Sequence, residues 1–538
     1  MAITITIAAG NSAAQIQAAI NGAPAGATVS LAAGSYTFDR TVVIDRDDIT
    51  VAGAGSSQTI ITTARGMGGA PAFQIGDPLF REGMTGGNSM QSAPEGARMI
   101  TVSSGHAFQP GDAIWIETAN DAAFLDGIGD TQWRGDQPLR TALATVTAVN
   151  GNQITLDRGL PFDFNTQGTV VREMDLNSGV ALKNMTLKGD FGAADPADFT
   201  NSLGAAKGGM MLLVNTSDGV VISGINIVQP GSNGLVIAKS IDAEVTNVTV
   251  TGAHNKGDGG NGYAFWIRDV YDSHFNALQA FDTRHAVLFA SVTSAAGNDV
   301  HVKATNRDIN FHGGLDHDNT VIVDKSVRTG AEQGYLGTVH FVNPGTDYGA
   351  PTDPLANTVQ FREVVGTVRS DLVYSTNAGS KISTLGGSDT LIGGNGNDRL
   401  DAGTGDDLIR ASRGSDTVIG GNGQDTVDFD VLRSDVTISV SKGQLVVRGE
   451  FGVTRMSGVE YVTFDNGRYQ VSDLMAQVSA KAQSADAFVF KALAVAAAEP
   501  VVMQTAESDQ EHHGHAIVAE HEAGWFHTMY GTDHFDLL

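Results

Sequence analysis

An aspartate recurs at every ninth position in one stretch of the chain. The series consists of Asp389, Asp398, Asp407, Asp416 and Asp425. Glycine and asparagine precede most of these aspartates, and one aliphatic residue follows each of them two positions later. Flexible loops that offer carboxylate and main-chain carbonyl oxygens suit Ca²⁺, whereas Mg²⁺ demands a stricter octahedral geometry. The spacing therefore predicts a series of calcium-binding loops.

The aliphatic residues indicate how these loops are arranged. One such residue per copy cannot be buried by that copy alone, so the copies have to stack. Two nonapeptides make one turn of a parallel β-roll, in which alternate aspartates line opposite edges. Glycine supplies the positive φ angles that tight loops need. We expect the calcium-binding residues to be Asp389, Gly396, Asp398, Gly405, Asp407, Asp416, Gly423 and Asp425.

These repeats resemble the calcium-binding repeats of the RTX family. Five copies follow one another in register, the second and fifth nearly complete, while the fourth has Ser412 and Arg413 in place of loop glycines. The resemblance covers only this stretch and the flank after it. It implies a calcium roll at 380–430, closed by a β-rich flank at 431–475. A flexible Gly/Asp/Asn linker is the alternative, but a linker has no reason to keep the periodic aliphatic residue.

A second group of reactive side chains lies between Asp258 and Asn319. Segments 263–269, 284–289 and 307–312 align as three successive turns. Arg284 precedes Arg307 by the same 23 residues that separate His285 from Asp308. We therefore expect each pair to lie about 4.8 Å apart on neighbouring strands.

Two reactions fit this group. In β-elimination on a uronic acid, Arg284 or Arg307 would neutralise the substrate carboxylate and so acidify the C5 proton. His285 or His312 would remove that proton, and Tyr263 or a second histidine would protonate the leaving oxygen.

Glycoside hydrolysis is the other reaction, with two of Asp282, Asp308 and Asp316 acting as acid and as base or nucleophile. For either reaction we expect the glycan to contact Trp266, Arg268, Asp282, Asp316 and His317. Paired Arg–Asp ladders also occur as pure structure. However, burying so many charges is costly unless they are paired or have a function.

The absence of known catalytic motifs narrows the choice between these reactions. The chain lacks the Asn-Thr-Asp, Gly-His-Gly and Arg-Ile-Lys set of polygalacturonase-like β-helices, and the Asp-Pro-His-Glu run of mannuronan epimerases, which otherwise combine a β-helix with RTX modules in this way. Its Arg-His and Phe-His-Gly phrases loosely resemble phage-tailspike-like β-helices. A lyase acting on an anionic glycan is the leading hypothesis. A glycoside hydrolase and a non-catalytic, calcium-binding matrix or cell-surface scaffold are the alternatives.

The elements that position this group are the coils of a β-helix. Similar short segments begin at Asn184, Asn247, Asn276, Asn298, Asn319 and Asn357. The middle ones are separated by about 20–30 residues, a typical length for one solenoid turn. Asparagines at the same corner of successive turns can hydrogen-bond along the stack. We interpret these asparagines as structural.

The N-terminal region supports the same fold. A helix is expected at 12–20 after a capping Ser12, followed by short strands at 28–31, 36–38, 42–44 and 49–51. This order resembles the N-terminal cap of pectate-lyase-like right-handed parallel β-helices. We therefore predict an all-β chain with a right-handed parallel β-helix at 1–375. Residues 90–172 read either as an antiparallel insertion, with an Asn-Gly turn, or as a longer coil of the same helix.

Composition limits the partners. A net charge of −27 over 538 residues argues against nucleic acid, although a local basic cleft or bound calcium can still attract an acidic polysaccharide. Cysteine is absent, which favours stabilisation by metal and stacked sheets. No segment has the length of a membrane span or the regions of a cleaved signal peptide.

Residues 476–538 are interpreted as a linker that ends in an acidic and hydrophobic segment. This segment resembles the C-terminal signals that RTX proteins present to a type I secretion apparatus. We therefore expect a secreted protein, extracellular or at the cell surface. The tail also holds a histidine cluster that could take up zinc.

Overall fold

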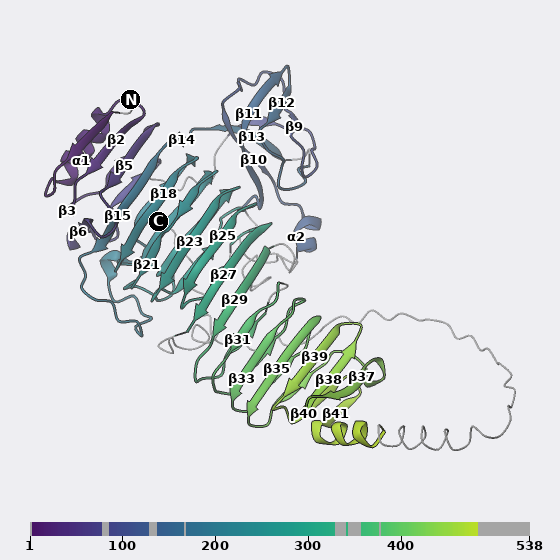
Figure 1. The fold of residues 1–538 in the computed structure, drawn as a ribbon. Helices are drawn as coiled ribbons and strands as arrows, with labels where there is room; N and C mark the ends of the chain where they lie inside the picture. Colours follow the sequence, from purple (N-terminus) through teal and green to yellow (C-terminus); the bar gives the residue numbers. More distant parts are fainter. Residues whose placement is uncertain are drawn as a thin grey trace, which may run out of the picture.

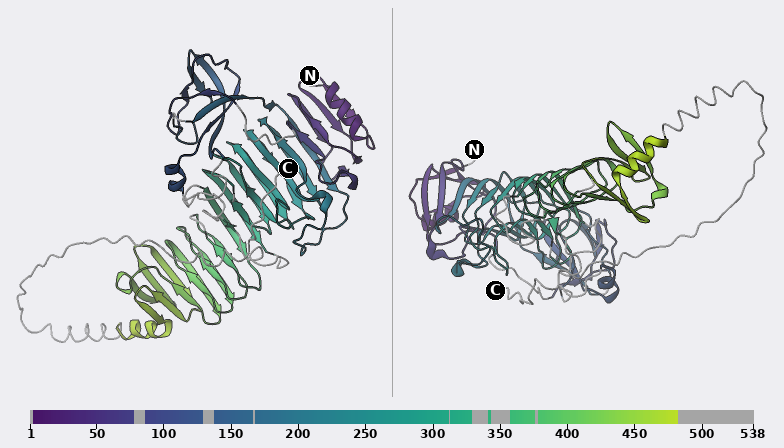
Figure 2. Two further views of the ribbon diagram at one scale, coloured as in Figure 1. Left: turned by 180° about the vertical axis from the view of Figure 1, so that it is seen from behind. Right: turned by 90° about the horizontal axis from the view of Figure 1, so that it is seen from below.

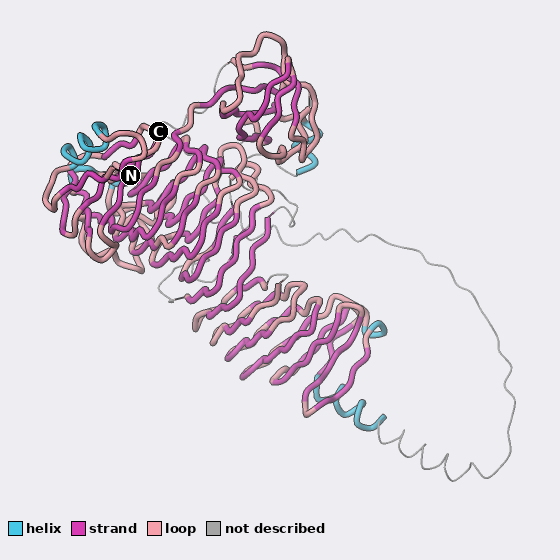
Figure 3. The backbone as a smooth tube through the Cα atoms, turned by 45° about the horizontal axis from the view of Figure 1, so that its top comes forward, coloured by secondary structure: helices cyan, strands magenta, loops and turns pink. Residues whose placement is uncertain are grey.

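The computed structural model describes residues 3–77, 86–128, 137–165, 168–311, 313–328, 341–342, 357–375 and 378–481. Over these residues the chain consists almost entirely of β-strands, stacked as successive turns of one elongated solenoid (Figure 1). Side chains in each turn lie directly above those of the turn before, because the strands pair in parallel. The tube in Figure 3 shows this stacking, with wider turns in the N-terminal part than in the C-terminal part.

Two sheets form the wider, N-terminal part. The strands of the first sheet, called sheet A, are β1 (Thr4–Ile7), β2 (Ala27–Leu31), β3 (Gly34–Phe38), β5 (Ile49–Gly53), β6 (Thr59–Thr63), β15 (Ala181–Gly189), β18 (Val221–Val228), β20 (Glu244–Thr246), β21 (Thr249–Thr251), β23 (His274–Phe281), β25 (Asp299–Thr305), β27 (Asn319–Val327) and β29 (Asn357–Val365). The strands of the second, called sheet B, are β4 (Val42–Ile44), β7 (Phe73–Ile75), β14 (Asn177–Ser178), β16 (Met210–Asn215), β17 (Ser217–Asp218), β19 (Asn233–Ile241), β22 (Tyr263–Tyr271), β24 (His285–Phe289), β26 (Ile309–Phe311) and β28 (Phe341–Val342).

The two sheets differ in how they are covered. Strands of sheet A alternate between buried and more exposed residues, as in β2 and β27, which is typical of a sheet with one face in water. Strands β19, β22 and β24 are buried at every position. Inward residues fill the core by stacking, for example Phe289 on Phe311 with ring centroids 4.6 Å apart. Polar residues on the outer face of sheet B are therefore enclosed as well.

A helix caps the N-terminal end. Helix α1 (Ala13–Gly22) begins after Ser12, whose side chain accepts from the Gln15 amide in a capping box. Its buried residues are Ala13, Ile16 and Ile20, which lie on the helical face expected from the sequence.

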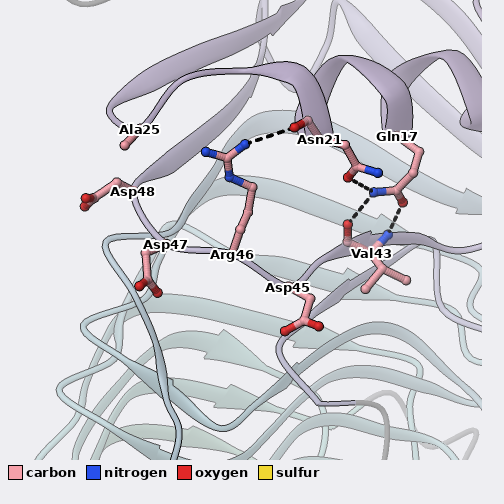
Figure 4. Close-up of a pocket in the computed structure, with 8 residues that line it drawn as sticks. All are labelled: Gln17, Asn21, Ala25, Val43, Asp45, Arg46, Asp47 and Asp48. Atoms are coloured by element: carbon pink, nitrogen blue, oxygen red, sulfur yellow. Dashed lines mark hydrogen bonds between the residues drawn. The ribbon is translucent and has the colours of Figure 1, made fainter. Parts of the chain in front are cut away.

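A depression of about 740 Å³ lies between this helix and the first turns, and Figure 4 shows its lining. Within it Arg46 donates from Nη1 to Ile20 O at 2.9 Å and to Ala23 O at 2.6 Å. Gln17 Nε2 donates to Val43 O, and Gln17 Oε1 accepts from the Val43 N–H, each at 2.7 Å. These polar groups hold the cap on the solenoid.

An antiparallel sheet interrupts the coils. It contains β8 (Asn88–Ser89), β9 (Met99–Thr101), β10 (Ala113–Thr118), β11 (Arg140–Asn150), β12 (Gln153–Leu156) and β13 (Thr169–Met174), with helix α2 (Ala122–Ile128) beside it. Figure 2 shows it projecting from one side of the solenoid. Buried Thr141 bonds Tyr271 and Ser294 of the coils, each at 2.6 Å, and Arg158 pairs with Asp242 and Asp272, each at 2.8 Å. These contacts fix the insertion against the coils.

Sheet A continues without a break into the C-terminal part, because β29 pairs in parallel with β31 (Lys381–Ser383) of the roll. Its further strands are β31, β33 (Arg399–Thr404), β35 (Gly414–Asn422), β37 (Thr437–Ser441), β38 (Gln444–Gly449) and β39 (Gly452–Ser457). The opposite sheet of the roll consists of β30 (Leu372–Tyr374), β32 (Thr390–Ile392), β34 (Leu408–Arg410), β36 (Thr426–Asp428), β40 (Tyr461–Phe464) and β41 (Gly467–Gln470). Short 3₁₀ turns occur at Arg65–Met67, Gly204–Ala206 and Arg433–Asp435, and residues 471–481 are helical.

The β-rich flank after the repeats extends the roll. Strands β39 and β40 pair in parallel with β35 and β36, so they form a further turn. Strands β38 and β41 then pair antiparallel with β39 and β40. These antiparallel strands end the stack.

The expected asparagine ladder is shorter than predicted. Asn298 Nδ2 donates to Asn319 Oδ1 at 2.8 Å, and Asn319 Nδ2 donates to Asn357 Oδ1 at 2.9 Å. The other three asparagines lie outside this ladder. Asn184 and Asn247 adopt positive φ angles of 60° and 55° within sheet A. Exposed Asn276 contacts His301 instead. A shared sequence phase did not reveal which corner each asparagine occupies.

Replacing Asn319 by alanine is expected to destabilise the coils by about 3 kcal/mol, because the substitution leaves buried polar groups above and below without partners. Asn276→Ala is the matched control, and we expect a change within about 0.5 kcal/mol there since that side chain is exposed. The urea midpoint of unfolding, followed by circular dichroism, measures both. Equal effects of the two substitutions would contradict the ladder.

Candidate functional site

The roll aspartates form a ladder in which one carboxylate oxygen serves the fold. Asp389 Oδ1 accepts from the Asp371 N–H at 2.7 Å, and Asp407 Oδ1 accepts from the Asp389 N–H at 2.8 Å. The same bond joins Asp416 to Asp398 at 3.0 Å and Asp425 to Asp407 at 3.0 Å. Each carboxylate thus stabilises the main chain of the turn before it.

The second oxygen of four of these carboxylates is available to a cation. Oδ2 of Asp389, Asp407, Asp416 and Asp425 is buried and has no hydrogen-bond partner among the described residues. Burial raises the pKa of these four carboxyl groups to about 6. A hard divalent cation would supply the missing partner, so the residues present fit calcium. No group of three or more His, Asp or Glu side chains in the described part of the chain is arranged as metal ligands. Main-chain oxygens would therefore supply much of the coordination.

The loop glycines are required by close packing of the turns. A Cβ on Gly405 would lie 1.8 Å from Gly387 O, and one on Gly423 would lie 1.8 Å from Gly405 O. At Gly396 the nearest atom, Gly379 N, would be 2.0 Å away. Any side chain at these positions would push the turns apart.

Three members of the ladder were missed from the sequence. Asp371 and Ser380 occupy the rungs before Asp389 and Asp398, and Ser380 N–H donates to Asp398 Oδ1 at 2.7 Å. After the last repeat, Glu460 Oε2 accepts from the Asp425 N–H at 2.9 Å, in the place of a further aspartate. An 18-residue period, extended toward the N-terminus, would have revealed the first two. Glu460 follows a hairpin that breaks the period.

The second candidate site lies where the chain passes from sheet A to sheet B. His285 begins β24 and Asp308 precedes β26 by one residue, so both lie at the same corner of successive turns. His285 Nδ1 lies 3.0 Å and 2.9 Å from the two Asp308 oxygens. The side chains of His285 and Asp308 are 2% and 1% exposed. The structure thus brings together the pair expected to be vertical neighbours.

The partners of His285 determine its tautomer. Arg284 Nε donates to His285 Nε2 at 3.3 Å, and an arginine N–H can only donate. Nε2 is therefore an acceptor, and Nδ1 carries the proton toward Asp308. Burial opposes ionisation of Asp308, but the His285 imidazole and the Arg328 guanidinium bring its pKa down to about 2. The result is an imidazole oriented by an ionised carboxylate.

Tyr263 and Trp266 lie beside this pair on β22. The Tyr263 ring centroid is 5.3 Å from that of His285 and 5.4 Å from that of Trp266. Burial raises the pKa of Tyr263 to about 12, so its phenol stays protonated at neutral pH. Trp266 is only 9% exposed and directs Nε1 toward Ala290 O, and Arg268 is 2% exposed. Neither side chain presents an open platform to a sugar.

Arg307 differs from the sequence expectation. Its side chain is fully buried, and its guanidinium donates to the main-chain carbonyls of Thr283 and Asn306. Its Nη2 lies 3.6 Å from Asp282 Oδ1. Asp282 in turn accepts from Asn306 Nδ2 at 2.9 Å. We therefore assign Arg307 and Asp282 to the scaffold of the corner and not to substrate binding.

The remaining predicted residues do not converge on His285. Asp316 is 2% exposed and faces Ser291, and His317 packs its ring against Phe162 with centroids 5.2 Å apart. Burial, with the nearby Asp269 charge as a further cause, raises the pKa of Asp316 to about 7. His312 lies outside the described residues, as does the C-terminal histidine cluster.

Asp316→Asn is expected to stabilise the protein at pH 8 and to change little at pH 4. The folded-state pKa of Asp316 is raised above the ordinary value near 3.9, so stability falls as the pH rises from about 4 to 7. The gain at pH 8 should be on the order of 3 kcal/mol. Thermal unfolding at the two pH values measures it. Destabilisation at pH 8 would show instead that the carboxylate has a partner it needs.

Several neighbours of the candidate site received no role from the sequence alone. Asp258 binds Arg284, Asn310 donates to Asp308 Oδ2 at 3.1 Å, and Arg328 donates to Asn306 O at 3.0 Å. Lys256 is buried and donates from Nζ to Asp195 O at 2.8 Å. Asp258, Lys256 and Arg328 lie in loops or just after a strand, where the coil period gives no information, whereas Asn310 is the central residue of β26.

Comparison with known proteins supports the two-part architecture. The repeat region matches the family model described as RTX calcium-binding nonapeptide repeat (4 copies), over residues 377–409 and 401–430. No curated protein sequence matches the chain. The nonapeptides are thus calcium-binding motifs, as predicted.

Several solved structures show similarity to this chain. The tailspike protein gp49 from Pseudomonas phage LKA1 has a TM-score of 0.50 and 15% identity, over 77% of this chain and 71% of that chain. The tailspike gp61 of Pseudomonas phage phi297 has a TM-score of 0.42 and 16% identity, over 78% of this chain and 67% of that chain. The A-module of Azotobacter vinelandii mannuronan C-5 epimerase AlgE6 has a TM-score of 0.24 and 12% identity, over 85% and 96%.

Identities this low bear on the fold alone. Together with the repeat match, the likeness to gp49 confirms the predicted class, an all-β chain with a parallel β-helix followed by a calcium roll. A specifically pectate-lyase-like helix stays a prediction, and the predicted secretion segment lies outside the described residues. Among the described helices, none has the length and apolar character needed to cross a membrane.

Proposed function

We propose that this chain is a secreted, calcium-dependent protein that acts on a polysaccharide, and that it cleaves an anionic glycan by β-elimination. The observation that carries the proposal is the His285–Asp308 pair, with its imidazole held in one tautomer beside Arg284 and Tyr263. A base, a cation for a carboxylate and a protonated phenol are the three groups that this reaction needs.

Each group has one role. Arg284 binds the carboxylate of the uronic acid, which makes the C5 proton more acidic. His285 Nε2 takes that proton, and the imidazolium that forms is stabilised by Asp308. The C4–O bond then breaks as the C4–C5 double bond forms, and Tyr263 donates its proton to the leaving oxygen. Proton exchange with water restores both side chains.

Calcium has a structural role in this proposal. When bound, it neutralises the stacked carboxylates of the roll, whose strand β31 pairs directly with β29 of the helix. RTX-type repeats are typical of secreted proteins. Calcium affinities of about 10⁻⁴–10⁻³ M, typical of extracellular modules, would let the roll fold only after export. The type I secretion apparatus is the expected route.

The experiment is incubation of the calcium-loaded protein with polyuronates such as alginate, pectate and glucuronan. Absorbance near 235 nm reports the unsaturated product, and a reducing-end assay reports any cleavage. We expect both signals to rise together on at least one polymer. New reducing ends without absorbance would indicate a hydrolase. The absence of both on every acidic glycan would end the enzymatic proposal.

A non-catalytic, glycan-binding scaffold is the second candidate. The observation that favours it is the near-complete burial of His285 and Asp308, which a substrate could not reach without movement of Arg284. In that case the protein would retain acidic polysaccharide in a calcium-dependent sedimentation assay while producing neither signal.

A further inference from the structure

The atom that must act as the base is covered by a neighbouring side chain. His285 Nε2 accepts a hydrogen bond from Arg284 Nε, and Nδ1 is committed to Asp308. Neither ring nitrogen can take a substrate proton in this arrangement. Any chemistry at His285 therefore requires Arg284 to move.

The outer end of Arg284 is held by a residue at the surface. Arg284 Nη1 donates to Lys256 O at 3.2 Å, and Nη2 donates to Asp258 Oδ1 at 2.6 Å. The Asp258 side chain is 79% exposed, whereas that of Arg284 is 10% exposed. The network thus runs from water through Asp258, Arg284 and His285 to buried Asp308.

The loop that carries Asp258 is held through its main chain, for example by Asn261 Nδ2, which donates to Asp258 O at 3.0 Å and to Gly259 O at 2.8 Å. Three glycines follow the aspartate, and Gly259, Gly260 and Gly262 have φ angles of 84°, 78° and 81°. The loop is held from outside by Asn201, which accepts from the Gly257 N–H at 2.9 Å and donates to Asp258 O at 2.8 Å. The Asp258 side chain itself is 79% exposed, so its rotation into water can release Arg284 to another anion without movement of the loop.

We propose that the Asp258 carboxylate occupies the place of a substrate carboxylate on Arg284, and that a uronate displaces it and uncovers His285 Nε2. The inference rests on the proposed function and adds the contact that keeps the base covered. A carboxylate can engage a guanidinium through two parallel hydrogen bonds, and a neutral sugar cannot. The arrangement therefore makes uncovering of the base depend on an acidic glycan.

Two further basic residues contact the corner that holds Arg284: the Lys256 carbonyl accepts from Arg284, and Arg307 donates to Thr283 O. Lys256 is fully buried, and burial followed by the Arg307 charge lowers its pKa to about 8. Its ammonium group donates to the carbonyls of Asp195 and Ala253, at 2.8 and 3.0 Å. Lys256 and Arg307 are thus cationic side chains of the same corner, and the carboxylates of Asp198, Asp282 and Asp195 lie near Lys256 as well.

Acylation of His285 by diethyl pyrocarbonate tests the inference, because the reagent requires a free imidazole nitrogen. Peptide mapping by mass spectrometry gives the rate at His285, with exposed His274 as the internal reference. We expect the rate of acylation at His285 to be at least fivefold higher in the Asp258→Asn variant than in the protein without this substitution. Asp39→Asn is the matched control, since it removes an exposed carboxylate from Arg40 elsewhere on the surface. A circular dichroism spectrum identical to that of the unmodified protein shows that each variant is folded.

Adding a free sugar to the same acylation experiment identifies the chemical class of the ligand that displaces Asp258. Galacturonate at millimolar concentration should raise the His285 rate in the unmodified protein, and galactose should not. Equal effects of the two sugars, or an unchanged rate in Asp258→Asn, would overturn the inference. If the rates respond as expected but no polyuronate is cleaved, the carboxylate exchange stands and the lyase proposal falls. If a polyuronate is cleaved but the rates do not respond, the lyase proposal stands and the exchange falls.

Discussion

Removal of calcium is expected to unfold the roll while the β-helix stays folded. In excess EGTA, peptides from residues 378–470 should lose their protection against hydrogen exchange, and peptides from residues 210–290 should keep it. The buried carboxylates in the roll would then face one another without a cation. Each ion present at 10–100 times its dissociation constant contributes about 1.4–2.7 kcal/mol, so several ions together exceed about 5 kcal/mol. That is a large share of the stability of a small domain.

Single substitutions test whether the ladder is the cause. Asp407→Ala removes a buried carboxylate that accepts from the Asp389 N–H of the turn before it. We expect this substitution to weaken calcium binding and its cooperativity. Asp401→Ala is the control, because this aspartate lies on β33, is partly exposed and is not part of the ladder. Isothermal titration with calcium measures both. Unchanged hydrogen exchange in EGTA, or equal calcium binding by the two variants, would contradict the proposed sites.

His285→Asn is expected to lower the rate of unsaturated-product formation by about 10²–10⁴-fold, the usual contribution of a general base. Asparagine Nδ2 can replace imidazole Nδ1 as the donor to Asp308, so the buried carboxylate keeps a partner and the fold survives. Glycan binding should stay within about twofold, because Arg284 and the remaining corner are retained. Initial rates at 235 nm and cosedimentation with the polymer measure the two quantities.

The comparison with a neighbouring histidine makes the result specific. His274→Asn changes an exposed imidazole on sheet A that pairs with Asp299 at 3.4 Å, and we expect no loss of turnover there. Asp308→Asn should also lower turnover, since it removes the group that orients His285. Full activity in His285→Asn would exclude this histidine as the base. A protein that binds glycan equally well in all three variants and never forms product is a scaffold.

The sequence by itself determined the calcium roll. Each nonapeptide carries at least one loop glycine, a carboxylate and a buried aliphatic residue, so a short local pattern contains the chemistry of the site. The coil length likewise determined that His285 and Asp308, 23 residues apart, meet on neighbouring turns. Periodic stacking turns a spacing in sequence into a contact in space, and for this reason such contacts are predictable.

Only the tertiary structure decided which charged residues serve the fold and which adjoin the candidate site. Arg284 and Arg307 occupy similar positions in sequence, yet Arg307 donates to main-chain carbonyls and Arg284 joins exposed Asp258 to His285. The burial of sheet B on both faces could not be predicted from the sequence either. Loops and the antiparallel insertion take part in these contacts, and their paths follow no repeat. Side-chain direction and solvent exposure depend on those paths, so they follow from the folded chain and not from its period.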